Sequence, residues 1–282
     1  MTQVAAETGA ALRRLVRNRL AIALVVLLPA IFFGAVVLVT PIREAWAELP
    51  SVPAVETPDR PILFHPDHPK PWGIVIEGSE RGLSAVYMGV AALGAVAALL
   101  ALDLVQKGAG ATRRLVLCGR RPTEILAGRL LGLVAVLAAA VACTFGLLRT
   151  VVRPEQPVAL LGALAIGALV HAAFGLLVGA LVRRELVGML LVVLLVNLDA
   201  GWLQNPLFYA SLQNRFLVEL LPAHGAVQAA AVAAFTDQSA AGPAGLGLGW
   251  TAALFVAAAA IFTARLRVAR PWRGRAPASG QT

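Results

Sequence analysis

The chain has 282 residues, of which 59% are hydrophobic and 14% are charged. Soluble domains hold about 45–50% apolar residues, so this composition excludes an ordinary soluble globular protein. The formal net charge of +9 does not indicate nucleic-acid binding, because the basic residues flank long apolar runs, where anionic membrane lipid favours them.

Six apolar segments are predicted to cross a bilayer as helices, which takes about 20 residues each. They are continuous and do not alternate in polarity, so helices are predicted in preference to a β-barrel. The fifth run, 186–198, reaches spanning length only when it is extended to 203. The predicted spans are 20–42, 83–104, 128–149, 156–182, 185–203 and 244–264. The predicted fold class is an all-α polytopic membrane protein in which residues 1–282 form a single transmembrane domain.

Residues 10–19, before the first span, are predicted to form a helix that lies in the membrane interface. One face is apolar and the opposite face is basic. An ordinary basic flank of the first span explains the same pattern equally well. The apolar residues are Leu12, Leu15 and Val16, and the basic ones are Arg13, Arg14 and Arg17.

The segment 43–82 is rich in proline, which forbids a long helix and favours an extended, loosely packed cap. Within it, His65, Asp67 and His68 offer metal-ligand chemistry, but a solvated turn explains them better because no further ligand is evident. No metal site is therefore predicted.

The loop 105–127 is predicted to contain a short helix, a break and a second helix that enters the bilayer. Gly119 can end the first helix, and Pro122 and Thr123 can start the second. Glu124 then falls in the first helical turn, where the helix dipole favours an acid.

The segment 204–240 is apolar but broken by proline and glycine, so it is predicted to pack at the outer surface or as a re-entrant helix. Of the 24 lysines and arginines, 17 fall on the side of the membrane that holds both termini, in the tail 265–282 among other segments. The positive-inside rule therefore predicts cytoplasmic termini and an even number of spans. The working location is the plasma membrane of a bacterium.

The sequence has no Gly-x-x-x-x-Gly-Lys-Ser/Thr, His-Glu-x-x-His or Gly-x-Ser-x-Gly, so no nucleotide or hydrolase site is predicted. His171 is the one ionisable residue placed near mid-membrane; a hydrogen bond between helices and a proton relay both remain open for it. With no carboxylate predicted at the midplane, energy for any transport is expected to come from elsewhere.

These features together resemble the membrane-spanning permease subunit of a type-2 ATP-binding-cassette (ABC) exporter. The matching pieces, in order, are the basic interfacial helix, Pro29 in the first span, the loop 113–129, and the outer segment 221–228 before the last span. The long proline-rich loop 43–82 departs from the compact members of that family.

The resemblance implies a dimer of permease subunits, identical or paired with a relative, on two cytoplasmic ATPases that bind ATP and magnesium. No cofactor is expected in this chain, and it is not expected to be an enzyme. By position, Arg120, Arg121, Thr123 and Glu124 are the candidate ATPase-coupling loop. Orientation in the membrane alone explains the arginines equally well, whereas Glu124 is not needed for orientation.

The resemblance also implies a substrate path at the dimer interface, lined by the second and fifth spans. The candidate lining residues are Tyr87, Met88, Asn197 and Asp199, for which plain helix packing is the simpler explanation. With so little polar lining, the expected substrate is amphipathic, drug-like or lipid-like. The competing functions are a non-transporting accessory or sensor protein and, third, a lipid-modifying enzyme.

Overall fold

The structure is a computed structural model that describes residues 3–17, 19–49, 74–107, 114–115, 118–119, 122–182, 184–205 and 215–268. Within these ranges, six helices are long and apolar enough to cross a membrane. The chain is therefore a multi-pass membrane protein of the all-α class, as predicted. The spans are α2 (Arg19–Val39), α3 (Glu80–Gln106), α5 (Pro122–Leu148), α6 (Pro157–Leu181), α7 (Glu185–Val196) continued by the π-helix η1 (Asn197–Leu203), and α11 (Ala241–Val268).

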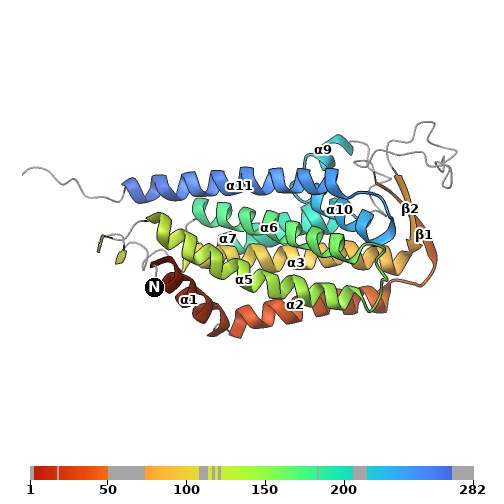
Figure 1. Ribbon diagram of the computed structural model, residues 1–282, viewed down its shortest axis with the longest axis horizontal. Helices are drawn as coiled ribbons and strands as arrows, with labels where there is room; N and C mark the ends of the chain where they lie inside the picture. Colours follow the sequence, from red (N-terminus) through yellow and green to blue (C-terminus); the bar gives the residue numbers. More distant parts are fainter. Residues whose placement is uncertain are drawn as a thin grey trace, which may run out of the picture.

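Successive spans run in alternating directions through one elongated bundle (Figure 1). The carboxyl end of α11 consequently lies at the same end as the short helix α1 (Gln3–Arg17), and we call this end of the bundle the α1 end. The opposite end carries the two strands and is called the strand end. The spans agree with the predicted segments to within a few residues at most boundaries.

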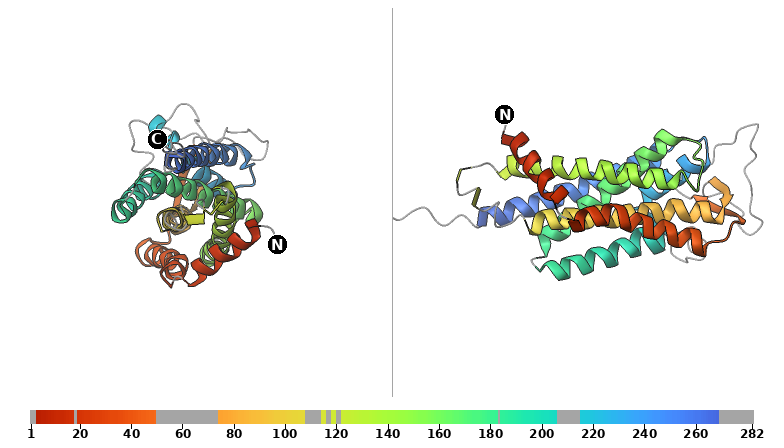
Figure 2. Two further views of the ribbon diagram at one scale, coloured as in Figure 1. Left: turned by 90° about the vertical axis from the view of Figure 1, so that its left-hand side faces the viewer. Right: turned by 90° about the horizontal axis from the view of Figure 1, so that it is seen from below.

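Helix α1 is a separate element that precedes the first span. It ends at Arg17, α2 begins at Arg19, and α1 lies at a marked angle to the bundle axis (Figure 2). It packs mainly against α5 and to a lesser extent against α2. A helix is thus present before the first span, as predicted, and it begins earlier than residue 10.

Helix α3 forms the centre of the bundle because small residues let α6 approach it closely. Gly167, His171, Gly175 and Gly179 recur every fourth residue on α6 and face α3. A Cβ added to Gly175 would lie 2.2 Å from the carbonyl oxygen of Ala98. In lipid, where no hydrophobic force pulls helices together, such small-residue stripes allow the backbone contact that holds two spans.

Two strands at the strand end close the long loop after α2. Strand β1 (Glu44–Leu49) pairs antiparallel with β2 (Ile74–Ser79), with Ala47 opposite Ile76. Ala47 and Ile76 are buried against the helices. The sequence predicts only an extended cap here, so this pairing is an addition to the prediction; residues 50–73, with the prolines and His65, Asp67 and His68, lie outside the described ranges.

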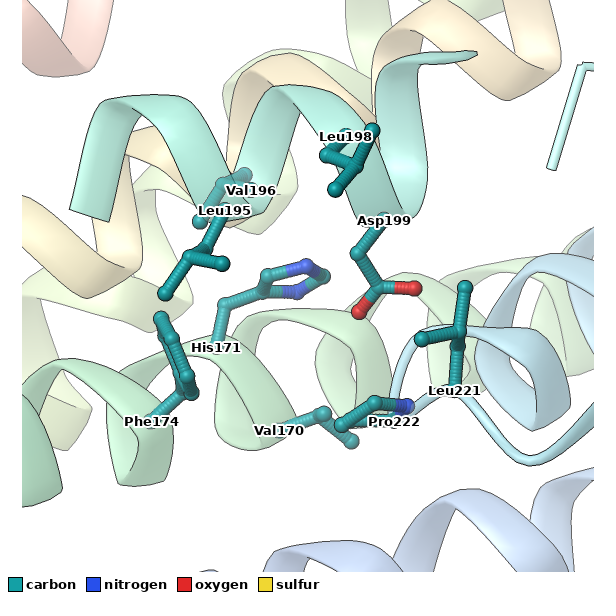
Figure 3. Close-up of a pocket in the computed structure, with 9 residues that line it drawn as sticks. All are labelled: Val170, His171, Phe174, Leu195, Val196, Leu198, Asp199, Leu221 and Pro222. Atoms are coloured by element: carbon teal, nitrogen blue, oxygen red, sulfur yellow. The ribbon is translucent and has the colours of Figure 1, made fainter. Parts of the chain in front are cut away.

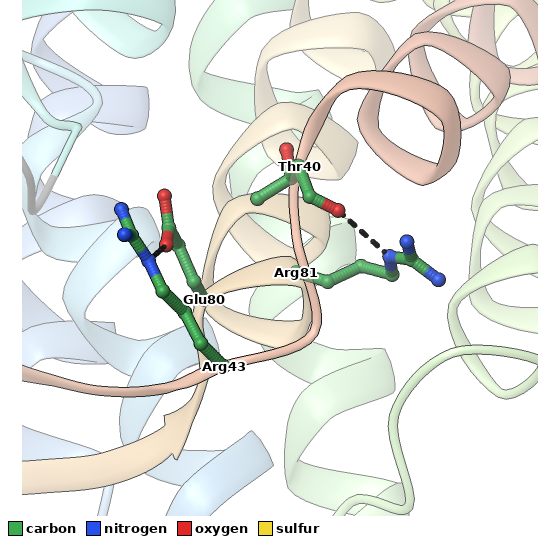
Figure 4. Close-up of polar contacts among 4 residues, drawn as sticks. All are labelled: Thr40, Arg43, Glu80 and Arg81. Atoms are coloured by element: carbon green, nitrogen blue, oxygen red, sulfur yellow. Dashed lines mark hydrogen bonds and ion pairs between the residues drawn. The ribbon is translucent and has the colours of Figure 1, made fainter.

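Polar contacts fasten the strand pair to the ends of α2 and α3 (Figure 4). The guanidinium of Arg43 forms an ion pair with Glu80, and the backbone N–H of Glu80 donates to the carbonyl oxygen of Arg43 at 2.8 Å. Nε of Arg81 donates to the carbonyl oxygen of Thr40 at 3.0 Å. The hydroxyl of Ser79 caps α3 by accepting from the N–H of Gly82 at 3.0 Å.

Helix α10 (His224–Phe235) lies near the strand end and is preceded by α9 (Arg215–Glu219). At about 1.5 Å per residue, its 12 residues are too short to cross a bilayer of about 30 Å. It packs against α6, α11 and α3, and nearly all of it is buried. The prediction that this segment does not span is therefore in agreement with the structure.

Both ends of α10 have backbone groups that other elements satisfy. At its start, the carboxylate of Asp199 accepts from the N–H of Ala223 at 3.1 Å. At its end, the N–H groups of Glu155 and Gln156 donate to the carbonyl oxygens of Ala234 and Ala233 at 3.2 and 2.9 Å. A buried helix needs such partners because its terminal amide groups have none within the helix.

Candidate functional site

The predicted coupling segment lies at the α1 end, where α5 begins. Glu124 sits in the first turn of α5 and is half-buried, which agrees with the predicted helix start. Thr123 is also in this turn, but its side chain is outside the described part, as are Arg120 and Arg121. The predicted break is present, since Gly119 adopts a φ of +89°, which favours glycine.

Helix α1 brings a second predicted feature to the same place. Arg13 and Arg17 are exposed, while the side chain of Arg14 is outside the described part. Helix α1 packs against α5, so the basic helix lies beside the helix that carries Glu124.

Polar side chains tie four spans together at the α1 end. Nζ of Lys107 pairs with Asp103 one turn earlier in α3 and lies 3.4 Å from Oε1 of Glu185 in α7. The hydrogen bond with Asp103 raises the pKa of Lys107. A guanidinium nitrogen of Arg265 in α11 donates to the carbonyl oxygen of Leu181 in α6 at 2.8 Å. These contacts join α3 to α7 and α6 to α11 at the α1 end.

The candidate path residues do not form one surface in the single chain. Helix α3 packs against α7 and η1, as a shared lining requires. Tyr87, however, is 2% exposed and faces the core, and Met88 is half-buried. Asn197 is exposed, and its side-chain amide donates to the carbonyl oxygen of Val193 at 2.8 Å.

Asp199 is the candidate path residue with the most informative surroundings. It lies in the first turn of η1, a π-helix, and such wide turns occur often at functional sites. Its Oδ2 accepts from the N–H of Ala223 at the start of α10, as described above. Its Oδ1 is buried and makes no hydrogen bond of normal length and angle among the described residues, although the side-chain amide of Gln204 lies near the carboxylate.

A cavity of about 200 Å³ lies between α6, the fifth span and the segment before α10. His171 and Asp199 project into it from opposite sides and point toward each other (Figure 3). His171 is 2% exposed, and its Nε2 is likewise buried without a partner among the described residues. The remaining wall is apolar and consists of Val170, Phe174, Leu195, Val196, Leu198, Leu221 and Pro222.

A second set of buried polar side chains, Gln204 and His224, lies near the strand end and was not predicted from the sequence. The side-chain amide of Gln204 donates to the carbonyl oxygen of Val218 at 3.1 Å, so its oxygen accepts from Nδ1 of His224 at 2.9 Å. Burial lowers the pKa of His224 to about 4, so this histidine is neutral at pH 7. No local pattern in the sequence pairs Gln204 with His224, because the two residues are 20 positions apart and other polar residues lie between them.

Comparisons with known proteins do not identify the chain. No protein-family model matches it, and the comparison with curated proteins finds no match.

Proposed function

We propose that this chain is the permease subunit of an ATP-driven ABC exporter in a bacterial plasma membrane. The observation that carries the proposal is the packing of α1 against α5 at the α1 end. This packing joins the two cytoplasmic features of the resemblance, the basic interfacial helix and the loop that leads into α5. The α1 end is proposed to be cytoplasmic because most of the basic residues belong to segments there.

The short buried helix α10 gives further support. The resemblance places a broken outer segment before the last span, and α10 is a non-spanning helix between the fifth and sixth spans, at the end opposite α1. With six spans, both termini lie on one side, so the basic tail 265–282 is proposed to be cytoplasmic too.

In this proposal, ATP and magnesium are bound by a separate ATPase subunit, which docks at Glu124 and the neighbouring loop. A second permease subunit, identical or related, completes the assembly, and membrane lipid surrounds it. ATP-driven closure of the ATPases tilts the spans between two packed arrangements. The substrate is proposed to be amphipathic, drug-like or lipid-like, since exposed polar side chains are sparse along the spans.

The proposal is tested by purifying the tagged chain from its native membrane in mild detergent and identifying what accompanies it by mass spectrometry and ATPase assay. A P-loop ATPase should co-purify with the wild-type chain and be lost from the double variant Arg121→Ala, Glu124→Ala. The matched control is Arg153→Ala, Glu155→Ala, which removes the same charges from exposed residues at the strand end. The control should retain the ATPase.

Recovery of the intact chain without any ATPase would overturn the proposal and favour an accessory or sensor protein. Equal loss of the ATPase from both double variants would instead remove the coupling role from Glu124 and Arg121. The first result tests whether the chain is a permease, and the second tests whether the ATPase docks at this loop.

A further inference from the structure

The cavity between His171 and Asp199 contains two buried polar atoms that make no hydrogen bond of normal length and angle within the described chain, Nε2 and Oδ1 respectively. A buried polar atom left without a hydrogen bond costs about 1–3 kcal/mol, so such atoms are rare in native proteins. Two of them facing one cavity, within spans of a membrane protein, indicate that something from outside the chain binds there.

The hydrogen-bonding state of His171 follows from its other ring nitrogen. Nδ1 lies 2.8 Å from the carbonyl oxygen of Gly167, and a carbonyl can only accept, so Nδ1 carries the hydrogen. In the neutral ring, Nε2 is then an acceptor. Gly94 leaves room for the ring on its other side, because a Cβ there would lie only 2.8 Å from Cγ and Nδ1 of His171.

Asp199 presents a second acceptor to the same space. Oδ2 is occupied by the N–H of Ala223, which leaves Oδ1 to face the cavity. A bound group that donates two hydrogen bonds, one to each acceptor, would satisfy both atoms. A positive charge on that group would also compensate the carboxylate in surroundings of low polarity.

The size and the wall of the cavity define the rest of the ligand. An engineered apolar cavity of about 150 Å³ in another protein holds benzene, so a cavity of about 200 Å³ has room for one ring and a short polar arm. We propose that this cavity binds a primary or secondary ammonium group carried on a small apolar body. The ammonium N–H groups donate to His171 and Asp199, and the apolar body contacts Phe174 and the aliphatic wall.

The cavity has a route to the surroundings through its rim. Leu195 and Leu198 line it and are 37% and 39% exposed on the surface of the fifth span. An amphipathic amine dissolved in the membrane can enter there. The inference goes beyond the proposed function, because binding requires no ATPase; where both hold, amines of this class are the molecules moved.

The test uses the chain alone, purified in lipid nanodiscs, with benzylammonium as the probe and empty nanodiscs to subtract partitioning into lipid. Titration calorimetry should show saturable binding to the wild-type chain. Benzyltrimethylammonium keeps the charge and the ring but has no N–H donor, so it should bind weaker by about tenfold or more. Asp199→Asn removes the charge but retains an oxygen that can accept from Ala223, and it should weaken benzylammonium binding to a similar degree.

A second pair of variants leaves both polar groups in place. Leu198→Trp fills the rim of the cavity and should abolish saturable binding, whereas Val256→Trp, at a position in α11 that is 65% exposed and does not line the cavity, should bind like the wild type. Folding of each variant is checked by its thermal unfolding midpoint. If Asp199→Asn fails to fold, the two tryptophan variants still test whether benzylammonium binds in the cavity.

Equal saturable binding by the wild type, Asp199→Asn and Leu198→Trp would overturn the inference, as would a folded wild-type chain that shows no saturable binding. In either case the two acceptors bind water only. Because no ATPase is present, these outcomes are independent of whether the chain is a permease.

Discussion

Gly175 of α6 lies against the backbone of Ala98 in α3 so closely that no side chain fits between them, with 2.2 Å separating an ideal Cβ from the Ala98 carbonyl oxygen. The contact is between backbone and backbone, so it cannot be relieved by a change of rotamer. Gly179, one turn along, faces Val105 in the same way at 3.1 Å, but there the neighbour is a side chain. The position of the central helix therefore depends most strongly on Gly175.

Gly175→Ala is expected to destabilise the chain by about 3 kcal/mol or more, at the upper end for overpacked sites, because two helices must move apart. The control is Gly162→Ala in the same helix, where an added Cβ meets nothing within 4 Å. That variant should be neutral or slightly stabilising, since alanine favours helix over glycine. Thermal unfolding midpoints in detergent test both, and similar midpoints for the two variants would contradict the packing argument.

Acid is expected to destabilise the chain through His224. Burial lowers its pKa in the folded chain to about 4, whereas an unfolded histidine titrates near 6.5, so the unfolded state binds more protons between these values. The contribution of neutral His224 to the free energy of unfolding is fully present above about pH 6.5 and is lost as the pH falls toward 4. Linkage gives a loss of about 2 kcal/mol between pH 7.5 and pH 5.

His224→Gln removes the titrating group and keeps a hydrogen-bonding side chain next to Gln204. The unfolding midpoint of the wild type should fall more steeply on acidification than that of this variant. Parallel pH profiles would show that His224 does not cause the acid sensitivity.

Gln156 is expected to stabilise the strand end through the carboxyl end of α10. Its side-chain amide donates to the carbonyl oxygens of Thr236 and Gln238 at 2.8 and 2.7 Å. Gln156→Leu preserves the size of the side chain but leaves both oxygens without this donor, at a cost of about 1–3 kcal/mol. Glu155→Leu, one residue earlier and exposed, is the control and should change stability little.

Hydrogen exchange of the α10 amides is the sensitive measurement for this pair. Faster exchange in Gln156→Leu but not in Glu155→Leu is the expected result. Unchanged protection in Gln156→Leu would mean that the backbone bonds from residues 155 and 156 suffice to hold the helix.

The spans could be predicted from the sequence because each depends on local composition. The even number of spans required by the distribution of basic residues excluded α10 as a span. Gly119 was identified as a helix end because glycine tolerates a positive φ. The pairing of β1 with β2 could not be predicted, since Ala47 and Ile76 are separated by a proline-rich loop that gives no register. Alternation of small apolar and polar residues in β1 was the only local signal.

The candidate site was predictable only in part, because local sequence does not show which distant residues come together. His171 and Asp199 were each conspicuous as ionisable residues in apolar runs, but they belong to different spans. Their convergence depends on the packing of α6 beside the fifth span and on the position of Gly94, which no local pattern encodes. The burial of Tyr87 likewise follows from the central place of α3, whereas the sequence shows only that α3 is apolar.

The exposed apolar face of α7 is expected to contact a second permease subunit. Leu186, Leu190 and Leu194 recur every fourth residue on α7 and are 80%, 68% and 59% exposed in the single chain. The resemblance to ABC permeases implies that the fifth span lies at the interface between two permease subunits. Leu190→Cys, in a background with Cys118 and Cys143 replaced by serine, should therefore form a disulfide-linked dimer in native membranes on mild oxidation.

The control is Val256→Cys in α11, which is 65% exposed but belongs to a span that the proposal leaves facing lipid. Random collisions in the membrane would cross-link both positions alike, whereas a specific interface should link Leu190→Cys much faster. Preferential linking through Val256→Cys would move the interface to α11. If the second subunit is a related protein, Leu190→Cys expressed alone should not form a disulfide-linked dimer. It should then cross-link only when the related subunit, with a cysteine at the matching position, is expressed with it.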